Sequence, residues 1–345
     1  MKLKNIILSA VLLLFIVNSG FSQYSTKKIK TKHEAYTDSL KQVEYDYIFP
    51  IWGQKVYEKG FDIPYPVGLM LNSVWMRQDI VFSNLQLGFE KEGIDIPLQS
   101  VEFIKFGQNT NNSQNYTFRP DVWVLPFLNI YGLFGVGSSK TSVNVVAPIN
   151  LATDVEQDFI TKGFGFMLAG GVGPIWVSTD FNWTWNKPEL LDKSVQVSIF
   201  GIRTGHTFVF KQNPKRNIAL WVGAMRAKMG TETIGQIALK DALPAEFWDT
   251  KDEAVTKYWN WYDNVATIPQ KIAADKVLTP IVESIDNADG SGIVKYAMDK
   301  QTKELWNGLI GAQFQLNKHW QIRTEAGIVG NRKSFLVSVN YRFLL

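Results

Sequence analysis

Apolar and polar residues alternate with a period of two along several segments of the chain. In the segment 174–186, one face carries Ile175, Val177, Phe181, Trp183 and Trp185, and the other carries Ser178, Asp180, Asn182, Thr184 and Asn186. Successive side chains of a β-strand point to opposite faces, so this pattern predicts a strand with one apolar and one polar face. The segments 306–317 and 319–330 alternate in the same way.

The end of the chain repeats the pattern. Its apolar face carries Phe335, Val337, Val339, Tyr341 and Phe343, and its polar face carries Ser338, Asn340 and Arg342. Leu336 and Leu344 are the exceptions. A strand of this kind suits a barrel that has lipid outside and water inside.

Short segments of this kind, separated by Gly, Pro, Asn and Asp, continue from Val67 to the end. They predict twelve strands, at 67–76, 79–90, 98–108, 117–136, 138–147, 162–172, 174–186, 194–210, 216–229, 306–317, 319–330 and 333–344. The segment 117–136 is long enough to contain two strands.

Two architectures fit this alternation, namely a soluble β-sandwich and a transmembrane β-barrel. Aromatic residues at the strand ends favour the barrel, because Trp and Tyr form belts at membrane interfaces. These residues are Trp183, Trp185, Trp306, Trp320 and Tyr341. We therefore predict an all-β fold, a transmembrane antiparallel up-and-down β-barrel of about twelve strands. A periplasmic sandwich remains the alternative.

The first residues predict export. Lys2 and Lys4 precede an apolar run over 6–17, and small residues Gly20 and Ser22 follow it. This is the pattern of a signal peptide, residues 1–22, cleaved after Ser22. The chain contains no Cys, which excludes a lipid-modified cysteine, disulfides and thiolate metal sites. Export and a barrel together predict the cell outer membrane.

The remaining chain divides into two regions. Residues 23–66 begin with lysines and contain several prolines, which predicts a periplasmic N-terminal arm or a plug. Residues 67–345 form the barrel and contain an insert, 230–305, that lacks strand alternation. If the last strand ends in the periplasm, an even number of strands places the arm in the periplasm. The insert then lies outside the cell or in the lumen.

Part of the insert has helical character. The segment 249–265 begins with acidic residues, and 269–284 predicts a second helix interrupted at Pro280. The insert also carries an aromatic group, Trp248, Tyr258, Trp259, Trp261 and Tyr262. These side chains either pack on the barrel rim or stack on a ligand such as a sugar.

Candidate chemistry lies mainly in the predicted lumen. Polar-face residues there are Asp180, Asn182, Arg203, Arg226, Lys228, Arg323, Glu325 and Arg342. None of the three histidines has a partner at metal-ligand spacing, so we predict no metal and no cofactor. His206 is the candidate base of a lipid hydrolase, with Ser178, Ser198 and Asp180 on nearby strands. The net charge of +4 and the absence of a basic patch interleaved with aromatics argue against nucleic acid.

The chain resembles Bacteroidota-type outer-membrane β-barrel proteins. The resemblance rests on the signal end Gly20-Phe-Ser22 followed by Gln23, and on Tyr341-Arg-Phe343 in the terminal strand. It implies contact with outer-membrane lipid and insertion by the barrel assembly machinery, which reads a C-terminal aromatic residue. Leu344 and Leu345 depart from that pattern. The segment Arg119–Tyr131 looks like a family signature, to which we attach no activity.

Three functions follow from these features. The first is porin-like, with passive or selective passage of an unknown small solute through a narrow lumen. The second is a surface receptor or adhesin that binds through the insert 230–305. The third is a barrel hydrolase that depends on His206.

Overall fold

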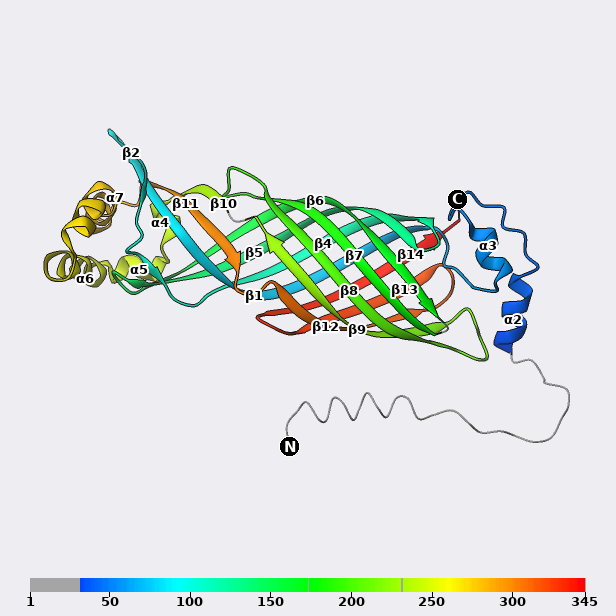
Figure 1. Ribbon diagram of the computed structural model, residues 1–345. Helices are drawn as coiled ribbons and strands as arrows, with labels where there is room; N and C mark the ends of the chain where they lie inside the picture. The colour runs from blue at the N-terminus through cyan, green and yellow to red at the C-terminus, as the bar shows by residue number, and fades with distance from the viewer. Residues whose placement is uncertain (1–31, 173, 231, 345) are drawn as a thin grey trace, which may run out of the picture.

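The computed structural model describes residues 32–172, 174–230 and 232–344. They form one sheet of fourteen strands that closes into a barrel (Figure 1). The strands are β1 Val67–Lys91, β2 Ile94–Ser100, β3 Lys105–Phe106, β4 Asn109–Leu125, β5 Leu128–Ala147, β6 Leu151–Val172, β7 Ile175–Pro188, β8 Val195–Val209, β9 Asn217–Met229, β10 Glu232–Ala238, β11 Ile293–Thr302, β12 Trp306–Gln315, β13 Trp320–Val329 and β14 Arg332–Phe343. The predicted signal peptide 1–22 lies outside the described residues.

Ten of these strands close the barrel, each antiparallel to its neighbours. Their order is β1, β4, β5, β6, β7, β8, β9, β12, β13 and β14, and β14 pairs again with β1. Closure is fixed by a register in which Val67 faces Phe343 and Gln78 faces Arg332. The predicted antiparallel up-and-down barrel is therefore confirmed, with ten closing strands and four further ones.

The difference from about twelve strands has a simple origin. The predicted strands 67–76 and 79–90 are one continuous strand, β1, because the polar residues between them mark no turn. The segment 117–136 does contain two strands, the end of β4 and the start of β5. The segment 98–108 supplies only β2 and β3, which lie outside the closed ring.

The outer wall carries an apolar belt at the turn end, the end of the barrel where the C-terminus lies. On β13 the belt runs from Trp320 through Ile322 to Ile328, and all three side chains are exposed. On β14 it runs from Phe335 to Tyr341. Nine residues from Trp320 to Ile328 match the roughly 9–11 residues with which a tilted strand crosses a bilayer.

Beyond the belt, the two faces exchange character. Along β5, the outer positions change from Phe134 and Val136 to Ser138 and Lys140, while the inner positions become Val143 and Val145. Along β6, the outer positions there are Asp154, Glu156 and Asp158. A wall with polar residues outside and apolar residues inside is that of a water-soluble structure. We call this part of the barrel the outer extension.

The predicted insert 230–305 contains strands as well as helices, contrary to the expectation of a segment without strands. β10 pairs with β11, and β11 continues the sheet beside β1 from Ile80 to Glu90. Between them lie four helices, α4 Leu239–Ala242, α5 Ala245–Asp249, α6 Lys251–Asn264 and α7 Ile268–Asp286. Strands β10 and β11 escaped prediction because they lie in the extension, where the two faces exchange character.

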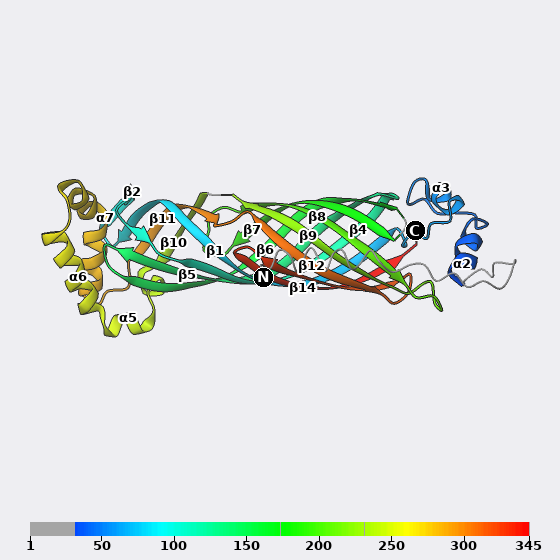
Figure 2. The same cartoon turned by 60° about the horizontal axis from the view of Figure 1, so that its bottom comes forward.

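These four helices form a cap over the end of the barrel opposite the C-terminus (Figure 1, Figure 2). The helix predicted at 249–265 is α6, and α7 continues through Pro280 without the predicted break. Thr267 and Gln270 form a reciprocal capping box that starts α7. A core that includes Phe89, Tyr258 and Val277 joins the cap to the extension.

The N-terminal arm lies at the turn end. It contains α2 Lys32–Leu40 and α3 Gly53–Glu58, which lie beyond the barrel strands rather than inside them (Figure 1). Lys318, in the turn before β13, forms an ion pair of 2.8 Å with Asp62 of the arm. Among the described helices, none is both long and apolar enough to cross a membrane.

Candidate functional site

The barrel encloses a cavity of about 740 Å³ that extends from the cap into the lumen. Its size falls within the range of small-molecule sites, about 300–1,000 Å³. Cap residues Leu239, Tyr258 and Ile281 bound it at one end. Arg203 and Glu325 bound it at the other.

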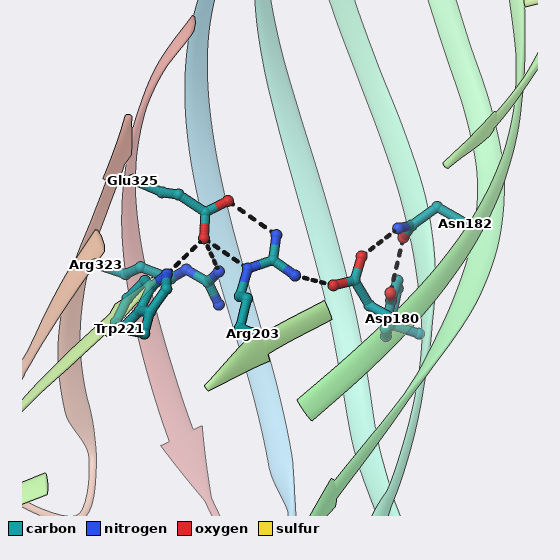
Figure 3. Close-up of polar contacts among 7 residues, drawn as sticks. Asp180, Asn182, Arg203, Trp221, Arg323 and Glu325 are labelled. Atoms are coloured by element: carbon teal, nitrogen blue, oxygen red, sulfur yellow. Dashed lines mark hydrogen bonds and ion pairs between the residues drawn. The ribbon is translucent and has the colours of Figure 1, made fainter. Parts of the chain in front are cut away.

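Predicted lumen residues meet at that second end in a charged cluster (Figure 3). Glu325 of β13 accepts two hydrogen bonds from Arg203 of β8, at 2.6 and 2.9 Å. The same carboxylate accepts hydrogen bonds from Arg323 and from the indole N–H of Trp221, each at 2.8 Å. Arg203 also contacts Asp180 of β7. A single carboxylate thus holds two guanidinium groups.

The cluster continues across the lumen to β5. Asn182 donates a hydrogen bond of 2.8 Å to Asp180, and the Tyr131 hydroxyl donates one of 2.7 Å to Asn182. The guanidinium of Arg119 lies 3.6 Å from the centre of the Tyr131 ring. We call Tyr131, Asp180, Asn182, Arg203, Trp221, Arg323 and Glu325 the floor network.

A second cluster lies between the floor network and the arm. Arg342 forms an ion pair of 3.0 Å with Asp121, and its guanidinium also donates to the carbonyls of Tyr65 and Pro66. Asn129 donates a hydrogen bond of 2.7 Å to Asp121. Arg203 and Glu325 are each 8% exposed and Arg342 is 4% exposed, so these side chains fill this part of the lumen.

Glycines make room for the bulky groups of the network. A Cβ at Gly201 would lie 2.6 Å from the Asp180 carboxylate and from the Arg203 guanidinium. A Cβ at Gly311 would lie 2.3 Å from the Trp221 ring. A side chain at Gly201 would therefore displace the charged ends of Asp180 and Arg203, and one at Gly311 would displace the Trp221 ring.

Two of the predicted lumen residues lie elsewhere. Arg226 and Lys228 share the outer face of β9 with Leu220 and Val222, whereas Ala227 faces the cavity. The sequence pattern predicts Arg226 and Lys228 inside the barrel, on the assumption that lipid covers the whole outer face of β9. Near the outer extension that assumption fails, since polar residues there face water outside the barrel.

The aromatic group of the insert takes a packing role. Tyr258 is 1% exposed in the core of the cap, and Trp248, Trp259, Trp261 and Tyr262 pack against that core. Trp261 stacks on Phe103 with ring centres 5.3 Å apart. Most of these rings therefore have protein partners.

The residues named for a hydrolase do not converge. His206 lies on the outer face of β8 beside Phe208, with ring centres 4.3 Å apart. Ser178 and Asp180 face the lumen, on the other side of the wall. Among the described residues, no group of three or more His, Cys, Asp or Glu side chains is placed to hold a metal ion.

Sequence reasoning missed several members of the two clusters. Arg119, Asp121, Asn129 and Tyr131 all come from the signature-like segment Arg119–Tyr131, which forms the β4–β5 hairpin. The available signal was that Arg119, Asp121 and Asn129 are polar residues within an otherwise largely apolar segment. Trp221 was assigned no role because an indole among apolar residues of a strand looks lipid-facing.

No protein-family model and no curated protein matches the chain. Three of the similar solved structures are the β domain of a Bordetella autotransporter, the transport unit of the Escherichia coli autotransporter AIDA-I, and the Ralstonia pickettii toluene transporter TbuX. Their identities are 7%, 10% and 7%, with TM-scores of 0.35, 0.35 and 0.29. The matches cover 81%, 92% and 81% of this chain, and 100%, 100% and 90% of theirs. Since these TM-scores are low, the fold rests on the strand pairing of this chain.

Proposed function

We propose that this protein is an outer-membrane β-barrel that accepts a small molecule in its lumen and passes it selectively. The observation that carries the proposal is the cavity of about 740 Å³ between the cap and the floor network. A general diffusion pore needs a continuous wide water path, as in barrels of about 16 strands. Ten closing strands whose lower lumen is filled by side chains do not provide one.

The apolar belt supports the location. Exposed large apolar side chains on the belt would be costly in water, whereas charged side chains facing lipid would cost about 2–4 kcal/mol each. The outer positions of the belt are largely apolar, and most charged side chains at its level point into the lumen. We infer that lipid surrounds the belt and that the outer extension and cap project from the membrane.

Single-channel conductance of the refolded protein in a planar bilayer tests the proposal that the lumen passes a small molecule selectively and is not an open pore. We expect no steady conductance from the intact protein. One variant replaces residues 239–292 by a two-residue turn, which is possible because Ala238 and Ile293 face each other in the β10–β11 pair. This variant should stay silent, because the floor network remains.

Removing the charged side chains that close the lower lumen should make the turn variant conduct. We expect the turn variant combined with Ala substitutions of both buried ion pairs, Arg203–Glu325 and Arg342–Asp121, to conduct, since the charged groups that fill the lower lumen are then gone. The matched control combines the turn with Lys140→Ala and Glu156→Ala, an ion pair on the outer wall, and should remain silent. Steady conductance from the intact protein would instead support a porin, and silence of every variant would contradict passage.

A receptor role is the second candidate, and one observation favours it. At the junction of α6 and α7, Val265, Ile268 and Ile272 are 69%, 76% and 55% exposed. Exposed apolar side chains on a surface-facing hairpin are typical of binding sites. Protease protection of this junction on intact cells, in the presence of a partner, would favour a receptor over a passage role.

A further inference from the structure

A row of polar side chains crosses the inner wall where the outer extension begins. In the sheet register, Arg332 of β14 faces Gln78 of β1, Gln78 faces Asn111 of β4, and Asn111 faces Thr141 of β5. Arg332 donates a hydrogen bond of 3.1 Å to Gln78, and Asn111 donates one of 2.9 Å to Thr141. Lys300 of β11 reaches the same row, with its ammonium 3.3 Å from the Thr141 hydroxyl. We call these five residues the polar row.

The two cations of the polar row lack counter-charges. Neither Lys300 nor Arg332 forms an ion pair with any described residue. Arg332 is 3% exposed, yet its Nη1 has no hydrogen-bond partner among the described groups. Burial without a neighbouring carboxylate lowers the pKa of Lys300 to about 8.

This is the reverse of the floor network, where each guanidinium faces a carboxylate. Over the whole cavity, the described lining contains five cationic side chains, Arg119, Arg203, Lys300, Arg323 and Arg332, and two acidic ones, Asp180 and Glu325. Buried charges are normally paired, because leaving one unpaired costs free energy. An anion bound beside Lys300 and Arg332 would therefore supply the counter-charge that the described residues do not.

The cavity between the polar row and the cap is apolar. Its lining includes Phe82, Phe106, Val145, Leu151, Ile281 and Val294. Strands β1, β5, β6 and β11 and the cap helices all contribute to it. An occupant of this chamber needs an apolar body, because a polar one would lose its hydrogen bonds with water.

We propose that the chamber binds a single-chain amphipathic anion, whose charged group is held at the polar row by Lys300 and Arg332 and whose apolar body lies toward the cap. This proposal deepens the function proposed above and rests on it. The Asn111 amide and the Thr141 hydroxyl are placed to orient the anionic group. The flexible stem of Lys300 lets its ammonium follow the ligand. A long-chain carboxylate has the required chemistry.

Probe binding to the full-length mature protein in phosphatidylcholine nanodiscs tests the assignment. The probe is a fluorescent long-chain carboxylate, and its methyl ester is the uncharged comparison. We expect Lys300→Met, which keeps the length and removes the charge, to weaken carboxylate binding by about tenfold or more. The ester should bind weakly to both proteins and equally well. Lys300→Arg should restore carboxylate binding.

Lys140→Met is the matched control, because Lys140 is the neighbour of Thr141 on the opposite face of β5 and pairs with Asp154 and Glu156. It should bind the carboxylate as the unaltered protein does, and heat-modifiable migration on a gel verifies folding of each variant.

Equal binding of ester and carboxylate, unaffected at Lys300, would overturn the anion site while leaving a lumen ligand in place. Loss of probe binding when phosphatidylglycerol is added to the discs would replace the single-chain occupant by a two-chain lipid. Absence of binding by either probe, together with conductance of the intact protein, would overturn the proposed function itself.

Discussion

Individual lumen residues could be assigned from the sequence on strands within the belt, where outward side chains are apolar and inward ones are polar. Asp180, Arg203, Arg323 and Glu325 face inward because each alternates with residues that face lipid. Which of them touch is a property of closure, since Arg203 and Glu325 are 122 positions apart along the chain. No local pattern reports that separation. Lys300 escaped notice for a related reason, because its strand lies in the extension, where the faces exchange character.

The floor network makes a prediction about Glu325. Glu325→Gln leaves two guanidinium groups in a buried site: Arg203 keeps its ion pair with Asp180, and Arg323 loses the one ion pair it forms with a described residue. Removing one partner of a buried ion pair typically costs about 3–5 kcal/mol, because the remaining charge is uncompensated. We expect a loss of this size in the free energy of unfolding, measured by urea titration in lipid vesicles.

Glu156→Gln is the comparison, since Glu156 pairs with Lys140 on the outer wall in contact with water. Exposed pairs of this kind contribute little to stability. If the two variants lose the same stability, the network has no special role in holding the barrel closed.

Among the elements, those with one uniform environment were easiest to predict. Strands β7, β12, β13 and β14 lie largely within the belt, and their alternation gave their positions to within a few residues. β1 and β6 pass from lipid into water, so their outer faces change from apolar to polar. That change looks like the end of a strand. The helix α6 was predicted because acidic residues mark its start. The Thr267–Gln270 capping box that starts α7 played no part in the prediction of the second helix.

The attachment of the cap makes a prediction about Tyr258. Its ring is buried in the core of the cap, and its hydroxyl hydrogen-bonds with Thr279 at 2.8 Å. Tyr258→Ala creates a cavity and should lower cap stability by about 3–5 kcal/mol. Tyr258→Phe removes only the hydrogen bond, at a cost of about 1 kcal/mol. Hydrogen exchange of the α6 and α7 amides measures both effects.

The barrel strands serve as the internal reference in that experiment. Exchange in β13 should be the same in both variants, because the cap joins the barrel only at the outer extension. Faster exchange throughout the barrel would mean that cap and barrel unfold as one unit.

At the scale of the whole molecule, the prediction of an even number of strands is correct although the predicted number itself is not. One merged pair and one strand outside the ring change twelve predicted strands to ten, and both numbers are even. The arm and the C-terminus consequently lie at the same end, and the cap lies at the other (Figure 1). The two long connections of the ring, between β1 and β4 and between β9 and β12, both lie at the cap end, which agrees with the usual asymmetry of outer-membrane barrels.

That asymmetry predicts the orientation of the molecule in the membrane. The β8–β9 turn should face the periplasm and the loop between α7 and β11 should face the medium. The chain contains no Cys, so a single introduced cysteine reports one position. Gln212 and Ser291 are both exposed, one in each connection. On intact cells, a membrane-impermeant maleimide should label Ser291→Cys and spare Gln212→Cys. After lysis both should react, which shows that each thiol is accessible. The opposite pattern would place the cap in the periplasm, and the chamber would then open toward the cell interior rather than toward solutes outside.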